Sequence, residues 1–129
     1  MNRNIYQKRL FFIGALWNWS AAIVFVGMSI FFTPSLPLFF NTIPENFLWF
    51  HLSMGAVFIF GIGYYWISKN TQRNRDLIKL GIIGKTFVFC LLTYGWQTDV
   101  VTILVFLAGA VDLLFTLLFV EALMKLDSI

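Results

Sequence analysis

Four long apolar segments, separated by short polar stretches, limit what this chain can fold into. They cover residues 10–32, 47–67, 77–94 and 100–123. Each has about the 17 to 25 residues that an α-helix needs to cross the hydrocarbon core of a bilayer. Together they leave no room for a soluble domain. The sequence therefore predicts one all-α transmembrane domain over residues 1–129, built as a four-helix bundle.

The composition agrees with this prediction. Hydrophobic residues make up 60% of the chain and charged residues only 12%, and the mean hydropathy is +0.83. Soluble domains are about half apolar and a quarter charged. We therefore expect a multi-pass protein of the cell (inner) membrane that has membrane lipids as its first partners.

The basic residues lie on one side of the predicted membrane. Their positions are Arg3, Lys8, Arg9, Lys69, Arg73, Arg75, Lys79, Lys85 and Lys125. The loops 33–46 and 95–99, on the other side, contain no Lys or Arg. The positive-inside rule then puts both termini and the 68–76 loop in the cytoplasm, with an up-down-up-down topology. Attraction to anionic lipid headgroups explains this charge, and we expect no nucleic-acid partner.

The outer loop between the first two segments is unusually apolar. Residues 33–50 read TPSLPLFFNTIPENFLWF, with prolines at 34, 37 and 44 that prevent the first helix from continuing. Two interpretations stay open. The loop is either an interfacial segment at the level of the lipid headgroups or a lid over an outward-facing pocket.

One carboxylate, Asp112, stands near the middle of the fourth segment. A charge in lipid costs roughly 2.5 to 3.5 kcal/mol on insertion scales, so such a residue usually faces the bundle interior. Small residues on the same helical face favour close packing against another helix. The residues on that face are Val105, Ala108, Gly109, Phe115 and Thr116. Glu121, nearer the cytoplasmic boundary, has Lys125 four residues further on, so we expect a surface ion pair there.

Lys85 is the expected partner of Asp112. If the 95–99 turn pairs Tyr94 with Val100, Lys85 is level with Gly109, and Asp112 lies one helical turn closer to the cytoplasm. A lysine side chain leans toward the nearer interface, here the cytoplasmic one, and so toward Asp112. Whether such a pair is functional or only structural stays open, because buried polar groups also hold membrane helices together.

Other polar and aromatic residues converge at the same depth. Asn18 lies in the first segment, and Tyr64 and Tyr65 lie in the inner half of the second. We predict a polar intramembrane pocket beneath aromatic side chains, among them Trp19. The candidate ligand-binding residues are Trp17, Asn18, Tyr64, Tyr65, Lys85, Asp112 and Thr116.

His51, near the outer end of the second segment, is the only histidine. A single histidine without a carboxylate-rich or HxxxH spacing does not predict a metal or haem site. We expect it to be an interfacial or hydrogen-bonded residue, with a role as a ligand as the alternative. We predict no cofactor and no metal.

Two stretches of the sequence resemble a known family. The run FGIGYYWISKNTQRNRDLIKLGIIGK (60–85) and the run AGAVDLLFTLLF (108–119) resemble small four-helix bacterial membrane proteins of the DoxX-like kind. The matching positions are Gly61, Gly63, Tyr64, Gly84, Lys85 and Asp112. The resemblance implies a four-helix bundle and, in some relatives, an association with quinone or redox chemistry. The thiol pair of some related redox families is absent, because Cys90 is the only cysteine.

Three functions stay open at this point. We favour a binding protein for a small hydrophobic molecule or lipid, acting alone, as a homo-oligomer or as an accessory subunit of a larger membrane complex. The second is a membrane enzyme for an isoprenoid, sterol-like or quinone substrate, with Asp112 as the catalytic acid or base and Lys85 as its electrostatic partner. The third is a proton- or ion-coupled transporter in which Asp112 titrates.

Overall fold

Four long helices make up nearly all of the structure, a computed structural model that describes residues 3–127. They are α1 (Arg3–Phe31), α2 (Leu48–Lys69), α3 (Arg75–Gln97) and α4 (Ile103–Asp127), and a short 3₁₀-helix, η1 (Thr33–Leu38), follows α1. All four are long and apolar enough to cross a membrane. The expected all-helical fold with four apolar helices is confirmed.

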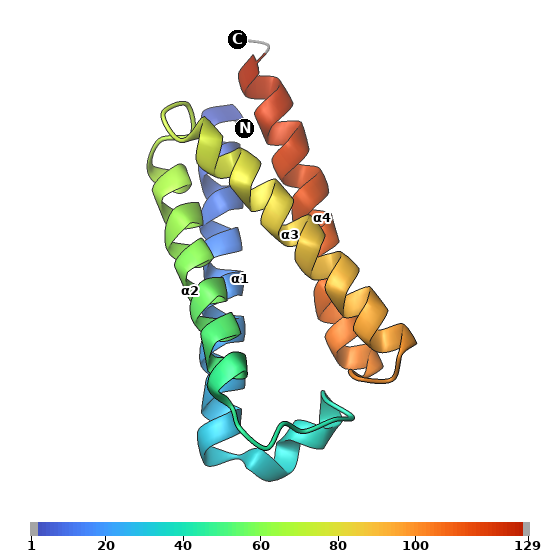
Figure 1. Ribbon diagram of the computed structural model, residues 1–129. Coiled ribbons are helices and arrows are strands. Elements are labelled where there is room, and N and C mark those ends of the chain that lie inside the picture. Colours follow the sequence, from blue (N-terminus) through green and yellow to red (C-terminus); the bar gives the residue numbers. More distant parts are fainter. Residues whose placement is uncertain (1–2, 128–129) are drawn as a thin grey trace.

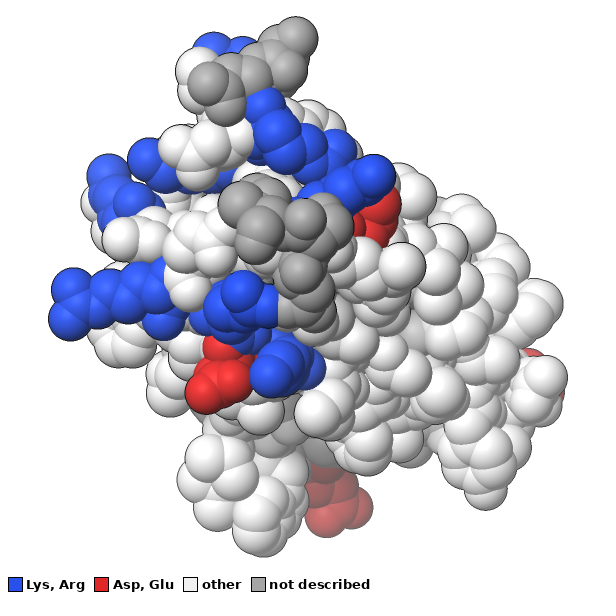
Figure 2. All heavy atoms as spheres, turned by 90° about the horizontal axis from the view of Figure 1, so that it is seen from above, with Lys and Arg blue, Asp and Glu red and all other residues white. Residues whose placement is uncertain are grey.

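The helices form two pairs. Helix α1 packs along α2, and α3 packs along α4, while the contacts between the pairs are fewer. The pairs cross near the end that carries both chain termini and diverge toward the opposite end (Figure 1). Lys and Arg side chains gather on the end that carries the termini, which we call the basic end (Figure 2). We call the opposite end, where η1 and the α3–α4 turn lie, the loop end.

The hydrophobic core lies in the half of the molecule next to the basic end. Its fully buried members include Phe11, Ile67, Ile78 and Phe119, and the rings of Phe11 and Phe119 stack with their centroids 4.4 Å apart. Residues facing away from this core, such as Ile23 and Phe87, are more than 60% exposed. An apolar surface of this kind on long helices is suited to contact with lipid tails.

Short connections fix the helix ends. The amide of Asn74 donates to the carbonyl oxygens of Trp66 and Asn70, at 3.0 and 2.8 Å. The carbonyl of Trp66, in the last turn of α2, also accepts from the backbone N–H of Asn70 at 3.3 Å, so Asn74 adds a second hydrogen bond at this helix end. At the loop end, Asp99 takes up the left-handed conformation (φ 59°) in the α3–α4 turn. Both connections are short enough to keep consecutive helices adjacent.

The apolar outer loop ties the two helix pairs together at the loop end. Phe40 and Val101 form an isolated antiparallel bridge. The amide of Asn41 donates to Val100 O and that of Thr102 to Phe39 O, both at 2.9 Å, and Thr102 Oγ1 donates to Leu38 O at 2.7 Å. Residues 39–41 and 100–102, which we call the outer bridge, therefore join the loop to the α3–α4 turn.

Two details differ from the sequence-based expectation. Helix α3 continues to Gln97, so the turn covers residues 98–102 instead of 95–99. In addition, Gly109 packs against Leu92, whose Cβ would lie 3.2 Å from a Cβ added at Gly109. The sequence-based expectation placed Gly109 level with Lys85, which is seven residues before Leu92 on α3. The expectation was wrong because it ended α3 at Tyr94 and began α4 at Val100, whereas α3 continues to Gln97 and α4 begins at Ile103.

Candidate functional site

The expected pair of Lys85 and Asp112 is present between α3 and α4. Lys85 Nζ lies 2.6 Å from Asp112 Oδ1. The lysine side chain is only 4% exposed and the aspartate side chain 13%. The flexible four-carbon stem of a lysine accommodates the shifted register of α3 and α4. Each charge compensates the other in surroundings where a lone charge would be strongly disfavoured.

Helix α1 completes the polar part of the site with two consecutive residues. Asn18 Oδ1 accepts a hydrogen bond from Lys85 Nζ at 3.0 Å, while Asn18 Nδ2 donates to Val57 O on α2 at 3.0 Å. The amide is thereby held in one orientation, with its oxygen toward the ammonium. Trp17 Nε1 donates to Asp112 Oδ1 at 3.2 Å. Residues of α1, α3 and α4 thus meet at one ion pair.

Two aromatic rings enclose the ammonium. Lys85 Nζ lies 5.3 Å from the ring centroid of Tyr64 and 5.0 Å from that of Phe115, within the range of cation–π attraction. Tyr64 reaches this position because α3 has a glycine opposite its ring. A Cβ at Gly81 would lie 2.7 Å from Tyr64 Cε1. We call Trp17, Asn18, Tyr64, Lys85, Asp112 and Phe115 the polar cluster.

The two oxygens of the Asp112 carboxylate differ in the hydrogen bonds that they accept. Both side-chain donors, Trp17 and Lys85, bind Oδ1, and within residues 3–127 no donor reaches Oδ2. Oδ2 is not sealed from the surface either. The one fully buried side-chain N or O atom without a partner in that range is Arg3 Nε. The polar cluster therefore contains one carboxylate oxygen with an unused capacity to accept hydrogen bonds, in a side chain that is 13% exposed.

The structure separates the remaining predicted residues. Thr116 is buried and donates to the backbone oxygen of Asp112 at 3.0 Å, so it supports the helix under the carboxylate. Tyr65 belongs to another group, with its ring 6.0 Å from that of Trp19 and 4.9 Å from Lys69 Nζ. Trp19 Nε1 donates to Phe58 O at 3.2 Å. Neither Trp19 nor Tyr65 forms a hydrogen bond with the polar cluster in the described part of the chain.

Two contacts at the basic end were not anticipated from the sequence. The carboxylate of Glu121 pairs with the guanidinium of Arg3, near the start of α1. One turn further into α1, Gln7 is 2% exposed and its Nε2 donates to Ala122 O at 3.2 Å. These contacts connect the first turns of α1 to the last turns of α4. No local spacing points to them, since the partners are 118 and 115 residues apart.

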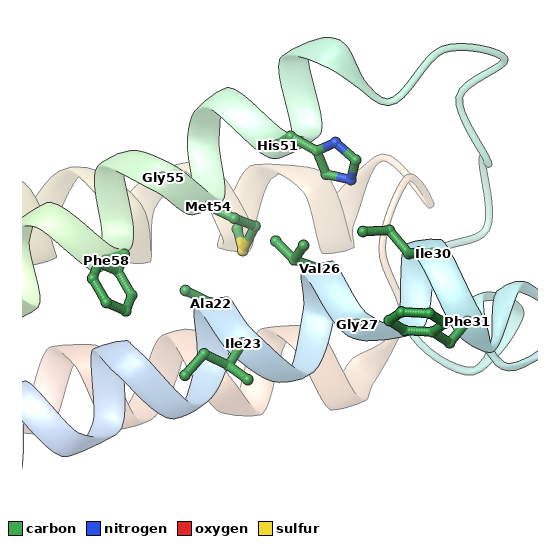
Figure 3. Close-up of a pocket in the computed structure, with 10 residues that line it drawn as sticks. All are labelled: Ala22, Ile23, Val26, Gly27, Ile30, Phe31, His51, Met54, Gly55 and Phe58. Atoms are coloured by element: carbon green, nitrogen blue, oxygen red, sulfur yellow. The ribbon is translucent and has the colours of Figure 1, made fainter.

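His51 is hydrogen-bonded, with Nε2 2.9 Å from Ser29 Oγ. It lines an open apolar groove of about 570 Å³ between α1 and α2 near the loop end (Figure 3). Gly27 and Gly55 lie on opposite walls, and a Cβ at either would meet no atom within 4 Å. No group of three or more His, Cys, Asp or Glu residues suited to a metal ion occurs among residues 3–127.

The fold and the polar cluster together define a class of protein. Four apolar helices of membrane-spanning length indicate a multi-pass membrane protein in contact with lipid. Its helices enclose a nearly buried ion pair. Comparisons with family models, curated proteins and solved structures find no match to this chain.

Proposed function

We propose that this protein binds a small hydrophobic molecule or a lipid at the polar cluster, and that Asp112 Oδ2 is the atom that receives the ligand's polar group. The observation that carries the proposal is that both side-chain donors among the described residues bind Oδ1 and leave Oδ2 without one. A structural ion pair buried for stability alone would gain from satisfying both oxygens, because an unpaired polar atom in a low-dielectric setting is unfavourable.

The chemical surroundings of Oδ2 limit which class of ligand can bind. Oδ2 accepts hydrogen bonds, so the ligand carries a donor such as a hydroxyl or an amide N–H. The pair of Lys85 and Asp112 is neutral as a unit, so the ligand is neutral too, since an added net charge in this setting would be costly. The aromatic rings of the cluster favour an apolar body next to the donor. Isoprenoid alcohols, sterol-like alcohols and quinols all have this combination.

The proposal includes a membrane arrangement. The chain is an integral protein of the inner membrane with up-down-up-down topology and both termini in the cytoplasm. The gathering of Lys and Arg at the end that carries the termini supports this, together with the absence of Lys and Arg from residues 33–46 and 95–99. In this arrangement the polar cluster lies within the hydrocarbon core. The proposed relationship to DoxX-like proteins rests on the sequence runs quoted above.

The test compares molecules that co-purify with wild-type and variant proteins in polymer-bounded native membrane discs. The informative variant is Lys85→Met with Asp112→Asn. It removes both charges together, retains an oxygen for Trp17 and can place an NH₂ group at the position of Oδ2. Glu121→Gln is the matched control, because it neutralises another carboxylate of α4 that lies outside the cluster.

We expect mass spectrometry to find one neutral donor-bearing molecule with wild type and with Glu121→Gln. Its amount should fall at least about tenfold in the double variant, equivalent to about 1.4 kcal/mol. Helical content by circular dichroism shows whether the double variant is folded. Equal amounts in all three proteins, or no retained molecule in wild type, would refute the proposal.

A further inference from the structure

A second apolar groove lies between α2 and α3, on the half of the molecule next to the basic end. Its volume is about 290 Å³. Ile59, Ile62, Gly63 and Trp66 of α2 face Leu77 and Leu80 of α3 across it. Along α2 the groove extends over about 10 Å, given 1.5 Å per residue from Ile59 to Trp66. Its length and apolar lining are suited to an alkyl chain.

The groove is open because of one glycine. A Cβ at Gly63 would meet no atom within 4 Å. Elsewhere along the contact of α2 with α3, aromatic rings of α2 fill the space between the two helices. A Cβ at Gly84 would lie 2.9 Å from Phe60 Cε1, and one at Gly81 would lie 2.7 Å from Tyr64 Cε1. The groove is therefore a shallow channel beside these filled contacts, on the outside of the molecule, where Trp66 and Leu80 are at least half exposed.

The charged residues next to the groove indicate what kind of headgroup would bind there. The segment that connects the two walls, residues 69–79, holds four basic residues and one acidic residue. The acid, Asp76, already lies 3.4 Å from Lys79 Nζ, and both side chains are more than half exposed. An apolar channel about 10 Å long thus lies next to a segment rich in Lys and Arg. This combination is complementary to an anionic phospholipid, with its phosphate at the cations and its chain in the channel.

The groove between α1 and α2 provides a contrast. It is larger, but it lies near the loop end, where residues 33–46 and 98–102 contain no Lys or Arg. Its polar lining residue is His51, which is engaged with Ser29. An anionic headgroup has no counter-charge there. The two grooves therefore differ in whether basic residues lie nearby, which is the property that selects an anionic lipid.

We propose that the groove between α2 and α3 holds one acyl chain of an anionic phospholipid whose phosphate binds the basic residues of segment 69–79. Tyr64 of the polar cluster also lines this groove, so the two sites adjoin, but the proposal does not depend on which molecule binds at Asp112. Ordered binding of one lipid at this position would also add a link between the two helix pairs, which otherwise share few contacts.

The experiment measures lipid binding to the whole protein in detergent micelles by native mass spectrometry. The probes are phosphatidylglycerol and phosphatidylcholine with identical acyl chains. Gly63→Leu fills the groove with a side chain that meets no neighbouring atom at its Cβ. Gly55→Leu is the matched control on the same helix, because its Cβ is equally unobstructed but projects into the other groove. A second pair of variants tests charge, with Arg73→Gln/Lys79→Gln near the groove and Lys8→Gln/Arg9→Gln on α1.

We expect wild type to retain one phosphatidylglycerol about tenfold more tightly than phosphatidylcholine. Gly63→Leu and Arg73→Gln/Lys79→Gln should each remove most of this preference, whereas the two controls should keep it. Equal binding of the two lipids by wild type would overturn the proposal. So would a Gly63→Leu variant that binds like Gly55→Leu. If Lys8→Gln/Arg9→Gln weakens binding as much as Arg73→Gln/Lys79→Gln does, general attraction by the basic end accounts for the result and the site is disproved.

Discussion

The ammonium of Lys85 lies 2.6 Å from the carboxylate of Asp112, and the two side chains are 4% and 13% exposed. A second ion pair, Arg3 with Glu121, lies at the basic end, but each of its side chains is 40% exposed. Both pairs join a basic side chain to a carboxylate, but their surroundings differ. Burial, more than the number of charges, should therefore decide how much each contributes to stability.

The first prediction concerns the buried pair. Lys85→Met or Asp112→Leu alone leaves an uncompensated buried charge and should lower the free energy of unfolding by about 3 to 5 kcal/mol. The double variant should recover most of this loss, because no charge remains. Glu121→Gln, in the exposed pair, should change stability by only about 0 to 1 kcal/mol. Denaturant unfolding in detergent micelles, followed by circular dichroism, measures all four. Additive losses in the double variant would contradict the interpretation of the pair as one compensated unit.

The sequence predicts the centre of the polar cluster well because lipid leaves few alternatives. A charge at mid-span must be neutralised, and Lys85 and Asp112 are the two charged side chains well inside predicted spans. Asn18 and Trp17 can then be predicted as neighbours of this pair, since polar groups in such a bundle turn toward one another. Tyr65 was grouped with Tyr64, but consecutive residues on a helix point about 100° apart. The ring of Tyr64 lies beside Lys85, whereas the ring of Tyr65 packs toward Trp19.

Contacts between distant segments were beyond sequence reasoning. Arg3 and Glu121 are separated by almost the whole chain, and periodicity carries no information on which helix ends meet. The register of α3 against α4 depended on where α4 begins. That point is set by the outer bridge, in which residues 100–102 pair with 39–41. Prolines and apolar residues in the loop indicated that it was not an ordinary solvated connection, but they did not identify its partner.

The second prediction uses two glycines of α2 that are two residues apart. A Cβ at Gly61 would lie 2.6 Å from Cδ1 and Nε1 of Trp19, whereas one at Gly63 would meet no atom within 4 Å. Gly61→Ala should therefore push the Trp19 ring away and weaken its hydrogen bond to Phe58 O, with a loss of about 1 to 3 kcal/mol. Gly63→Ala should be neutral or stabilising by up to about 1 kcal/mol, because alanine favours helix. Thermal unfolding of the two variants side by side measures the difference, and equal melting temperatures would contradict the close contact of α1 with α2.

The third prediction concerns the outer bridge. Thr102→Pro removes the backbone donor to Phe39 O, whereas Thr102→Val removes only the side-chain bond to Leu38 O. Hydrogen exchange should show a protected Asn41 amide in wild type, because that amide donates to Val100 O. We expect exchange at Asn41 to accelerate at least about tenfold in Thr102→Pro and less in Thr102→Val, since losing one of a few paired bonds lowers the free energy of local opening. Unchanged protection in Thr102→Pro would mean that the loop is held by its aromatic contacts, such as those of Phe40 with Phe25 and Phe50.

The fourth prediction tests orientation in the membrane. In a Cys90→Ala background, Glu45→Cys places a thiol in the loop that lacks Lys and Arg, and Gln72→Cys places one in the basic turn between α2 and α3. Both positions are exposed. Because positively charged loops stay in the cytoplasm, a membrane-impermeant maleimide should label Glu45→Cys in intact spheroplasts. It should label Gln72→Cys only after lysis. The Cys90→Ala parent controls for background labelling. Labelling of Gln72→Cys before lysis would reverse the proposed orientation, and partial labelling of both positions would indicate two orientations in the same membrane.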